Sequence, residues 1–198
     1  MARQLRVFIA GISVHVIHRG NNRQTIFADD EDHAVFLSLL VPIFREHEIA
    51  THGYVLMKNH FHLQVTPGHK RSLPNGMKKL GVKYVRYFNR KHDRIGHLFA
   101  ARAREILITD ERYWLTCLRY IEQNPVRARI VSTPGEYRWS SHGANAWGEP
   151  CDWLTRHPLY LSLGQTDAAC QAVYRAFVES PQSEAELIPQ RLDASAAP

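Results

Sequence analysis

Polar and aliphatic residues alternate along several short segments of the chain, which is the pattern of half-buried β-strands. In residues 7–17, Ser13 and His15 interrupt a run of aliphatic residues, which predicts a strand with one buried face. The same reasoning predicts strands or extended segments at residues 51–57, 61–66 and 97–108. Lys58-Asn59 predicts a hairpin turn between the segments 51–57 and 61–66.

Three further segments have the period of α-helices. The first begins at Asp29 or Asp30 and runs to about His47, the second covers residues 76–91, and the third begins at Thr109 or Asp110 and ends before Pro125. The predicted inner stripe of the first helix is Ala34, Phe36, Leu37, Leu40, Ile43 and Phe44, and that of the third is Tyr113, Trp114, Cys117, Leu118 and Ile121.

The resulting element order, β-α-β-β-α-β-α, predicts an α+β fold with a ferredoxin-like split βαβ antiparallel sheet. A chain of 198 residues has room for one such core. We expect the main domain to cover residues 5–145 and a helical extension to cover residues 146–178. Residues 179–198 are rich in Ser, Glu, Gln, Pro and Ala, which predicts a mobile tail.

The charge of the chain favours an anionic partner. Lys and Arg number 25 against 19 Asp and Glu, for a net charge of +6, and many of the cations fall within residues 78–104. Nucleic acid fits this excess, although a basic chain can also simply be soluble. The three cysteines have neither disulfide nor zinc-ligand spacing, which favours a reducing, cytoplasmic location, and the first apolar run predicts a strand instead of a signal peptide.

Two histidines on the third predicted strand are candidate metal ligands. His60 and His62 are two residues apart, so both imidazoles point to the same face of the strand. This spacing alone also fits an ordinary half-exposed strand in a chain with 12 histidines.

Tyr120 and Asn124 lie four residues apart towards one edge of the apolar stripe of the third helix, so both can face the same neighbour. Tyr120 offers a phenolic oxygen as a nucleophile, and Asn124 offers an amide oxygen as a third metal ligand. Alternatively, Tyr120 is a packing residue and Asn124 only ends the helix. Tyr84, Tyr87 and Tyr113 are rival nucleophiles, but none has an amide four residues further on.

Two imidazoles and one amide oxygen form a neutral, partly open ligand set. Such a set is compatible with Mg or Mn, and the ligand types alone do not exclude zinc. A divalent metal here would polarise a phosphate that a tyrosine attacks in line.

Basic and amide side chains provide candidate DNA contacts in three places. On the second predicted helix the candidates are Lys79, Lys83, Arg86 and Arg90, which recur every three or four residues. Arg102 adds charge downstream, and Arg19, Asn21, Asn22 and Arg23 form a turn that can bond to base edges. Alternatively, the helix cations form an ordinary solvated face and the residues of the turn form a plain connection. The aromatic residues between the helix cations are as readily explained by packing.

Several motifs together resemble a known family, the single-tyrosine HUH transposases, and within it the REP-associated tyrosine transposases. The matching residues are His15-Val16-Ile17-His18-Arg19-Gly20-Asn21-Asn22-Arg23-Gln24, Gly53-Tyr54-Val55-Leu56-Met57-Lys58-Asn59-His60-Phe61-His62-Leu63, Tyr87-Phe88-Asn89-Arg90, Gly96-His97-Leu98-Phe99, Arg102, Arg119-Tyr120-Ile121-Glu122-Gln123-Asn124-Pro125-Val126-Arg127-Ala128 and Trp139-Ser140-Ser141. They span roughly residues 5–145 in the order of the family.

The resemblance implies that His60 and His62 bind a divalent metal with Asn124 as third ligand, and that Tyr120 forms a 5′-phosphotyrosine and releases a 3′-hydroxyl. It implies single-stranded DNA hairpins as partners, a possible homodimer, no membrane, and a bacterial cytoplasm with the protein bound at the nucleoid. Lys58 and Gln123 depart from the usual residues of the family, away from the proposed chemistry.

Two other functions remain open from the sequence. The chain could be a non-catalytic single-stranded nucleic-acid-binding protein, or a metal-dependent nuclease that uses activated water. A replication-initiator relative fits less well, because no segment resembles an attached helicase.

Overall fold

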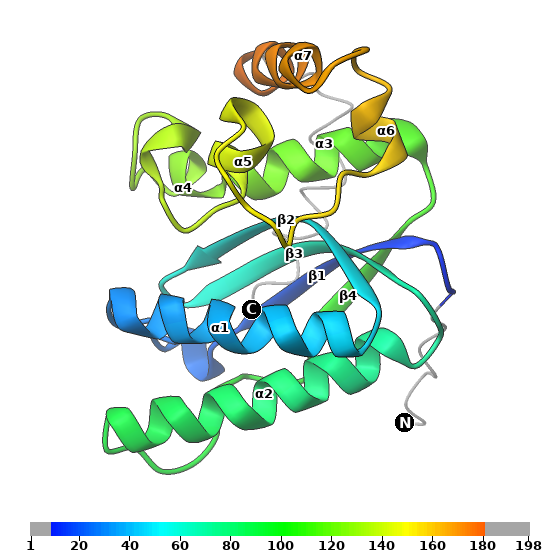
Figure 1. Ribbon diagram of the computed structural model, residues 1–198. Coiled ribbons are helices and arrows are strands. Elements are labelled where there is room, and N and C mark those ends of the chain that lie inside the picture. The colour runs from blue at the N-terminus through cyan, green and yellow to red at the C-terminus, as the bar shows by residue number, and fades with distance from the viewer. Residues whose placement is uncertain (1–8, 181–198) are drawn as a thin grey trace.

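The computed structural model describes residues 9–180, which form a four-stranded sheet with helices on both faces (Figure 1). The strands are β1 (Ser13–Arg19), β2 (Ile49–Met57), β3 (His60–Pro67) and β4 (Arg104–Ile108). The helices are η1 (Asn21–Arg23), α1 (Asp30–Glu46), α2 (Ser72–Lys91), α3 (Glu111–Glu122), α4 (Asn124–Arg127), η2 (Pro134–Glu136), α5 (His142–Trp147), α6 (Pro158–Leu161) and α7 (Asp167–Glu179).

The sheet has the strand order β2-β3-β1-β4, and every pair of neighbours is antiparallel. With the element order β1-α1-β2-β3-α2-β4-α3, this arrangement confirms the predicted α+β, ferredoxin-like fold. Lys58-Asn59 forms the predicted two-residue turn between β2 and β3.

The helices α1 and α2 cover one face of the sheet (Figure 1). Their core is almost entirely apolar and includes Phe36 and Leu40 of α1 and Leu80 and Tyr84 of α2. The start of α1 is fixed by Asp29, whose carboxylate accepts a hydrogen bond from the backbone N–H of Asp32. Hydrophobic burial is therefore the main source of stability on this face.

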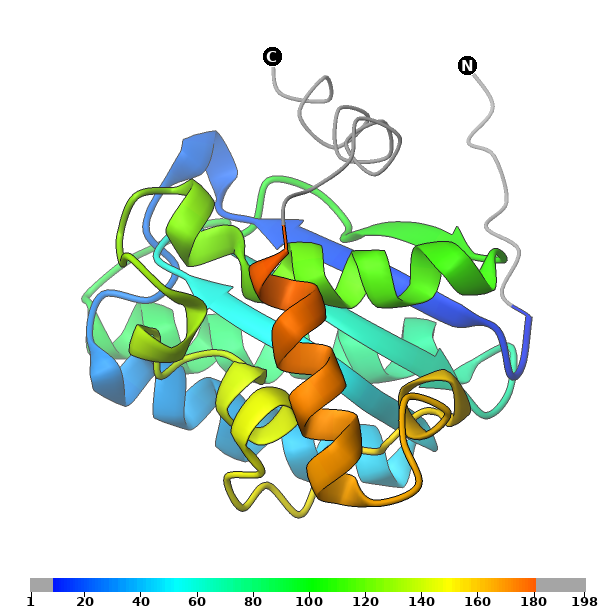
Figure 2. The ribbon, with the colours of Figure 1, turned by 90° about the horizontal axis from the view of Figure 1, so that it is seen from above.

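The other face carries α3, and the C-terminal helices pack on α3 in turn. Figure 2 shows α7 running across α3, so α3 lies between the sheet and α7. Trp114, Cys117, Leu118 and Ile121 of α3 are buried as predicted, while Tyr113 is only partly buried. The third predicted helix is thus confirmed with its apolar face on the sheet.

The structure corrects four details of the sequence prediction. β1 begins at Ser13, because Gly11 adopts a positive φ of 78° and turns the chain just before it, and residues 7 and 8 lie outside the described residues. Both faces of β1 are buried, since α3 covers the side that was expected to be exposed. α2 begins at Ser72, four residues earlier than predicted, and only residues 104–108 of the segment 97–108 pair as a strand.

The inner stripe of α1 also differs from the prediction. Ala34 is exposed and Leu37 is only partly buried, while Asp32 and His33 are buried instead because they take part in polar and stacking contacts at the start of α1.

The division at residue 145 stays a prediction, and α5 runs across it. Most of the expected mobile tail, residues 181–198, lies outside the described residues. Within residues 9–180, no helix is long and apolar enough to cross a membrane.

Candidate active site

The β2–β3 hairpin positions the two candidate metal ligands at the start of β3. The ring centroids of His60 and His62 are 5.1 Å apart, with the ring planes at 80°. His62 is almost fully buried and His60 is partly exposed. Both therefore point from β3 towards the α3 face, as the period of two predicts.

Helix α3 brings Tyr120 to these histidines. The ring centroid of Tyr120 lies 5.7 Å from that of His62, and the guanidinium carbon of Arg127 lies 5.1 Å from the Tyr120 ring centroid. Asn124, the first residue of α4, donates its amide N–H to the carbonyl oxygen of Tyr120 over 3.0 Å. Its side chain also hydrogen-bonds to His60. The structure thus brings together all four residues expected at the site.

Each metal-ligand candidate is oriented by a neighbouring side chain. Nδ1 of His60 lies 2.7 Å from Oδ1 of Asn59, and Nδ1 of His62 lies 2.8 Å from Nε2 of His15. These contacts occupy the Nδ1 atoms, so Nε2 is the nitrogen of each ring that remains for a ligand bond.

The sequence prediction missed His15. This residue stands opposite Gln64 in the β1–β3 pairing, which makes His62 its diagonal neighbour on the same face. Its ring is fully buried and stacks on His62 with centroids 5.1 Å apart. The sequence offered one signal for it, because the alternation of side chains along β1 places His15 on the face that α3 covers.

All three histidines are neutral at pH 7. Burial, together with the charge of Arg19, lowers the pKa of His60 to about 4, although the hydrogen bond to Asn124 opposes this shift. Burial also lowers the pKa of His62 well below its ordinary value, and it lowers the pKa of His15 to about 3. Neutral imidazoles are the form that binds a metal ion.

The turn after β1 is held close to this site. The backbone N–H of Gly20 donates to the carbonyl oxygen of Asn59 over 2.8 Å, and Arg19 is opposite His60 in the pairing of β1 with β3. Asn22 and Arg23 have positive φ values of 48° and 55°, which are uncommon for residues other than glycine. Asn21, Asn22 and Arg23 are exposed on a turn with a defined conformation.

The basic residues of α2 lie elsewhere. Figure 1 shows α2 on the face of the sheet opposite α3, so Lys83, Arg86 and Arg90 are on the far side from Tyr120. Nζ of Lys79 lies 2.6 Å from a carboxylate oxygen of Glu46 on α1, which occupies that cation. The helix is amphipathic as predicted, and Tyr84 and Phe88 are core residues.

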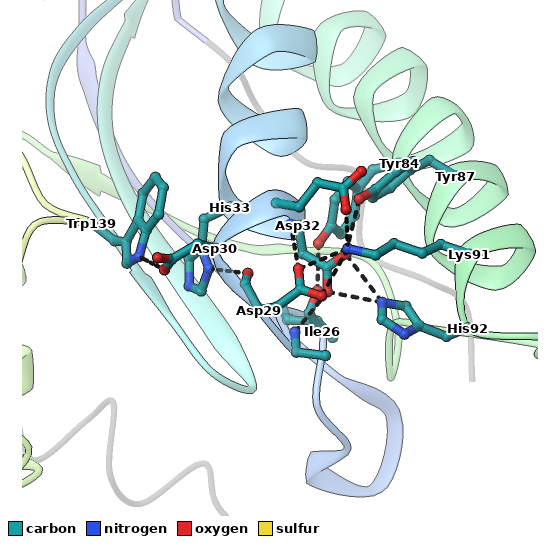
Figure 3. Close-up of polar contacts among 12 residues, drawn as sticks. Ile26, Asp29, Asp30, Asp32, His33, Tyr84, Tyr87, Lys91, His92 and Trp139 are labelled. Atoms are coloured by element: carbon teal, nitrogen blue, oxygen red, sulfur yellow. Dashed lines mark hydrogen bonds and ion pairs between the residues drawn. The ribbon is translucent and has the colours of Figure 1, made fainter.

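A second group of possible cation ligands lies at the start of α1, where Asp29, Asp32 and His92 come close together (Figure 3). Nζ of Lys91 lies 2.7 Å from Asp29 and 3.1 Å from Asp32, so the cation at this position is an ammonium group. The hydroxyl of Tyr87 also donates to Asp32, over 3.1 Å. This group joins the start of α1 to the end of α2, and a metal would have to displace Lys91.

A buried carboxylate fixes α3 to the C-terminal helices. Glu122 is completely buried and accepts hydrogen bonds from the hydroxyls of Ser141 and Tyr174 over 2.6 and 2.9 Å. The amide of Asn145 donates over 2.8 Å, and Nδ1 of His142 lies 3.0 Å away. These contacts give Glu122 and Ser141 a structural role, which is to hold α3 against the C-terminal helices.

The structure thus places a histidine pair on one strand of a ferredoxin-like sheet and a tyrosine on the helix that covers it. The family model for IS200-like transposases matches residues 8–124, more than half of the chain. The chain therefore belongs to the IS200-like transposase family, which confirms the resemblance seen in its motifs and makes it a DNA transposase by family. No curated protein matches the chain.

Two solved structures extend the comparison. The REP-associated tyrosine transposase bound to a REP hairpin is 16% identical with a TM-score of 0.59, covering 79% of this chain and 93% of that one. A transposase-like protein from Deinococcus radiodurans is 17% identical with a TM-score of 0.41, covering 65% of this chain and 92% of that one. The first of these confirms the fold.

Proposed function

We propose that this transposase cuts and rejoins single-stranded DNA hairpins through a 5′-phosphotyrosine on Tyr120, with a divalent metal at His60, His62 and Asn124. The observation that carries the proposal is the 5.7 Å between the ring centroids of Tyr120 and His62, in a chain of the IS200-like family. An aromatic residue that only packed would not need two neutral imidazoles and an amide beside it.

The donor set suits Mg or Mn. His60 and His62 are neutral and have their Nδ1 atoms occupied, and the amide of Asn124 hydrogen-bonds to His60. A bound divalent ion would polarise the phosphate and offset the charge that develops on its oxygens.

The reaction conserves phosphoester bonds. The phenolic oxygen of Tyr120 attacks the phosphorus, the bond from phosphorus to the 3′-oxygen breaks, and the phenolic proton ends on the released 3′-hydroxyl. The guanidinium of Arg127, which lies over the Tyr120 ring, would contribute positive charge at the site. A DNA 3′-hydroxyl later attacks the phosphotyrosine and regenerates the phenol.

Several exposed cations and amides would hold the DNA. We infer that Arg19, Asn21, Asn22 and Arg23 contact the DNA next to the cleaved bond, because Arg19 is opposite His60 on the neighbouring strand. We further infer phosphate contacts from Arg102, Lys83, Arg86 and Arg90, whereas Lys79 would first have to leave Glu46. The similar REP-associated transposase is bound to a REP hairpin, which supports hairpin DNA as the substrate.

A DNA substrate also indicates where in the cell the protein acts. We propose that the protein works in the bacterial cytoplasm and is held at the nucleoid while bound to DNA. A homodimer stays a prediction.

The deciding experiment mixes the full chain with end-labelled hairpin DNA, with and without Mn or Mg, and looks for a covalent adduct that resists denaturation. We expect an adduct that requires metal and disappears in Tyr120→Phe. The matched control is Tyr113→Phe on the same helix, which should retain the adduct.

Two results would overturn the proposal. Tight binding without any adduct would favour a non-catalytic binding protein. Cleavage that persists in Tyr120→Phe without an adduct would favour a nuclease that uses activated water.

A further inference from the structure

Gln64 is a fully buried amide on β3 that the proposed reaction does not use. It follows His62 by two residues, so both side chains lie on the face of the sheet that α3 covers. A polar side chain in such a place stabilises the fold only if both ends of its amide find hydrogen-bond partners. The partners of the two ends therefore indicate what Gln64 does.

The nitrogen end of the amide is bonded to the helix that carries the candidate nucleophile. Nε2 of Gln64 donates a hydrogen bond to the carbonyl oxygen of Trp114 on α3 over 3.1 Å. A carbonyl oxygen can only accept, so the nitrogen of the amide must face it and Oε1 must face away from it. The orientation of the amide is thereby fixed, and β3 is tied to α3 upstream of Tyr120.

The oxygen end of the amide needs a donor. Oε1 of Gln64 is buried, and within residues 9–180 no group donates a hydrogen bond to it. A buried acceptor without a donor loses its hydration and gains nothing in return, which makes such atoms rare in folded proteins. A donor close to Gln64 would remove this cost.

The residue paired with Gln64 carries a suitable donor. His15 on β1 is directly opposite Gln64 in the pairing of β1 with β3, and its ring is fully buried on the same face. Side chains directly opposite one another in an antiparallel pair have Cβ atoms about 5 Å apart. Nε2 of His15 lies 2.8 Å from Nδ1 of His62, and the second nitrogen of the ring, Nδ1, can donate as well.

Only one arrangement of hydrogens in this histidine pair permits a metal at His62. Binding of a metal through Nε2 of His62 requires the hydrogen of that ring on Nδ1, from which it is donated to Nε2 of His15. His15 must then carry its own hydrogen on Nδ1. In the reverse arrangement His15 donates from Nε2, and the hydrogen of His62 occupies the nitrogen that would bind the metal.

We propose that Gln64 is a positioning residue for the metal site, whose Oε1 accepts a hydrogen bond from Nδ1 of His15, directly or through one buried water molecule. Because α3 holds the amide in one orientation, this bond selects the arrangement in which Nε2 of His62 is ready for a metal ion. This inference rests on the proposed function, because it explains how the histidine pair is prepared for that metal.

The first test needs no variant of Gln64. NMR of ¹⁵N-labelled histidine shows which ring nitrogen carries the hydrogen, and it is applied to the full chain without metal or DNA, with signals assigned from single replacements. We expect the hydrogen on Nδ1 in both His15 and His62. A native chain in which His62 carries its hydrogen on Nε2 overturns the proposal.

The second test removes the acceptor. Gln64→Met has a side chain of similar size without an oxygen, while Gln64→Glu keeps an oxygen acceptor towards His15 in either protonation state. The matched control is Thr66→Val, the next residue of β3 on the same face, which loses its hydrogen bonds with Ser13 and His52 instead. Urea unfolding of all three variants measures the loss of stability separately.

Mn binding to the DNA-free protein is then measured by titration, together with the histidine signals. Gln64→Met should weaken Mn binding about 10- to 100-fold, as expected for the loss of a group that orients a metal ligand, and should move the hydrogen of His62 towards Nε2. Gln64→Glu should restore both properties. Thr66→Val should change neither.

Three further results overturn the role of Gln64. They are a Gln64→Met variant that keeps the native signals and Mn affinity, a Gln64→Glu variant that is no better than Gln64→Met, and a Thr66→Val variant with the same defect as Gln64→Met. If Gln64→Met does not fold, the spectrum of the native chain decides.

The same measurements separate this inference from the proposed function. If any of the contrary results occurs while the native chain binds Mn and forms the Tyr120 adduct, only the role of Gln64 is refuted. If the native chain neither binds Mn nor forms the adduct, the proposed function itself fails.

Discussion

The two faces of the sheet are stabilised by different interactions. Under α1 and α2 the core is made of aliphatic and aromatic side chains, and its buried carboxylate, Asp32, lies at the edge beside Lys91 (Figure 3). Under α3 the buried residues include the imidazoles of His15, His52 and His62, the amide of Gln64, a guanidinium and the carboxylate of Glu122. One face therefore depends almost entirely on hydrophobic burial, while the other combines an apolar cluster with buried polar groups that need hydrogen-bond partners.

This difference indicates where the sequence serves function at the expense of stability. A buried polar group stabilises the fold only if its hydrogen bonds are made, and it destabilises the fold when a partner is lost. The α3 face carries such buried polar groups next to the candidate active site. The α1 and α2 face holds no candidate catalytic residue, and its core carries few buried polar groups.

The largest expected effect is on stability, at Glu122. In Glu122→Gln, the new amide N–H faces groups that donate to the carboxylate in the native protein, so the free energy of unfolding should fall by about 3 kcal/mol. Glu111→Gln, on the exposed start of the same helix, should change it by less than about 0.5 kcal/mol. Urea unfolding measures both. Equal stability of the two variants would show that the α3 face does not depend on this network.

The next effect concerns His15, which we expect to act as a positioning residue for His62. Removing its hydrogen bond in His15→Leu should raise the Mn concentration for half-maximal adduct formation about 10- to 100-fold. Saturating Mn should restore the adduct, which loss of structure would not allow. His18→Leu, on the other face of β1, serves as the control for the Mn requirement. A Mn requirement unchanged in His15→Leu would contradict the positioning role.

The smallest effect expected of a single substitution is that of His52→Gln on the pH dependence of stability, which also separates the two faces. Burial lowers the pKa of His52 to about 4, and the pKa values of His15, His60 and His62 are lowered as well. Below pH 6.5 the unfolded chain takes up protons that these folded histidines exclude. Stability should therefore fall from pH 6.5 to pH 4, with a limiting slope of about 1.4 kcal/mol per pH unit for each histidine.

The carboxylates of the other face respond at lower pH. The hydrogen bonds from Ala28, His92 and Lys91 outweigh burial and lower the pKa of Asp32, so its contribution is lost only as pH falls below its ordinary value of 3.8. Urea midpoints at pH 7, 6 and 5 test the histidines, and His52→Gln should reduce the slope. A stability that is constant from pH 7 to pH 5 would contradict this assignment.

The sequence predicts the fold and the centre of the site well, because both depend on local periodicity. The period of two places His60 and His62 on one face, and the spacing of four places Tyr120 near Asn124. Helix α3 and the hairpin of β2 and β3 also have clear end signals, in Asp110 and in Lys58-Asn59.

What the sequence does not predict depends on contacts between distant segments. His15 is 47 residues from His62, and only the register of β1 against β3 makes them neighbours. Glu122 resembles an exposed helix residue until Ser141 and Tyr174 are folded onto it. The position of α2 on the face opposite α3 also separates its cations from Tyr120, which no local pattern reveals.

The single phenol beside the histidine pair also has a thermodynamic consequence. On the proposed chemistry, Tyr120 takes over one phosphoester and later returns it, so a full cycle of cutting and rejoining leaves the number and kind of phosphoester bonds unchanged. The chemistry of the full cycle then favours neither the original nor the rearranged DNA. The direction of the reaction is set by which DNA end stays bound, so the residues that hold the flanking strand would decide whether a cut element leaves or returns.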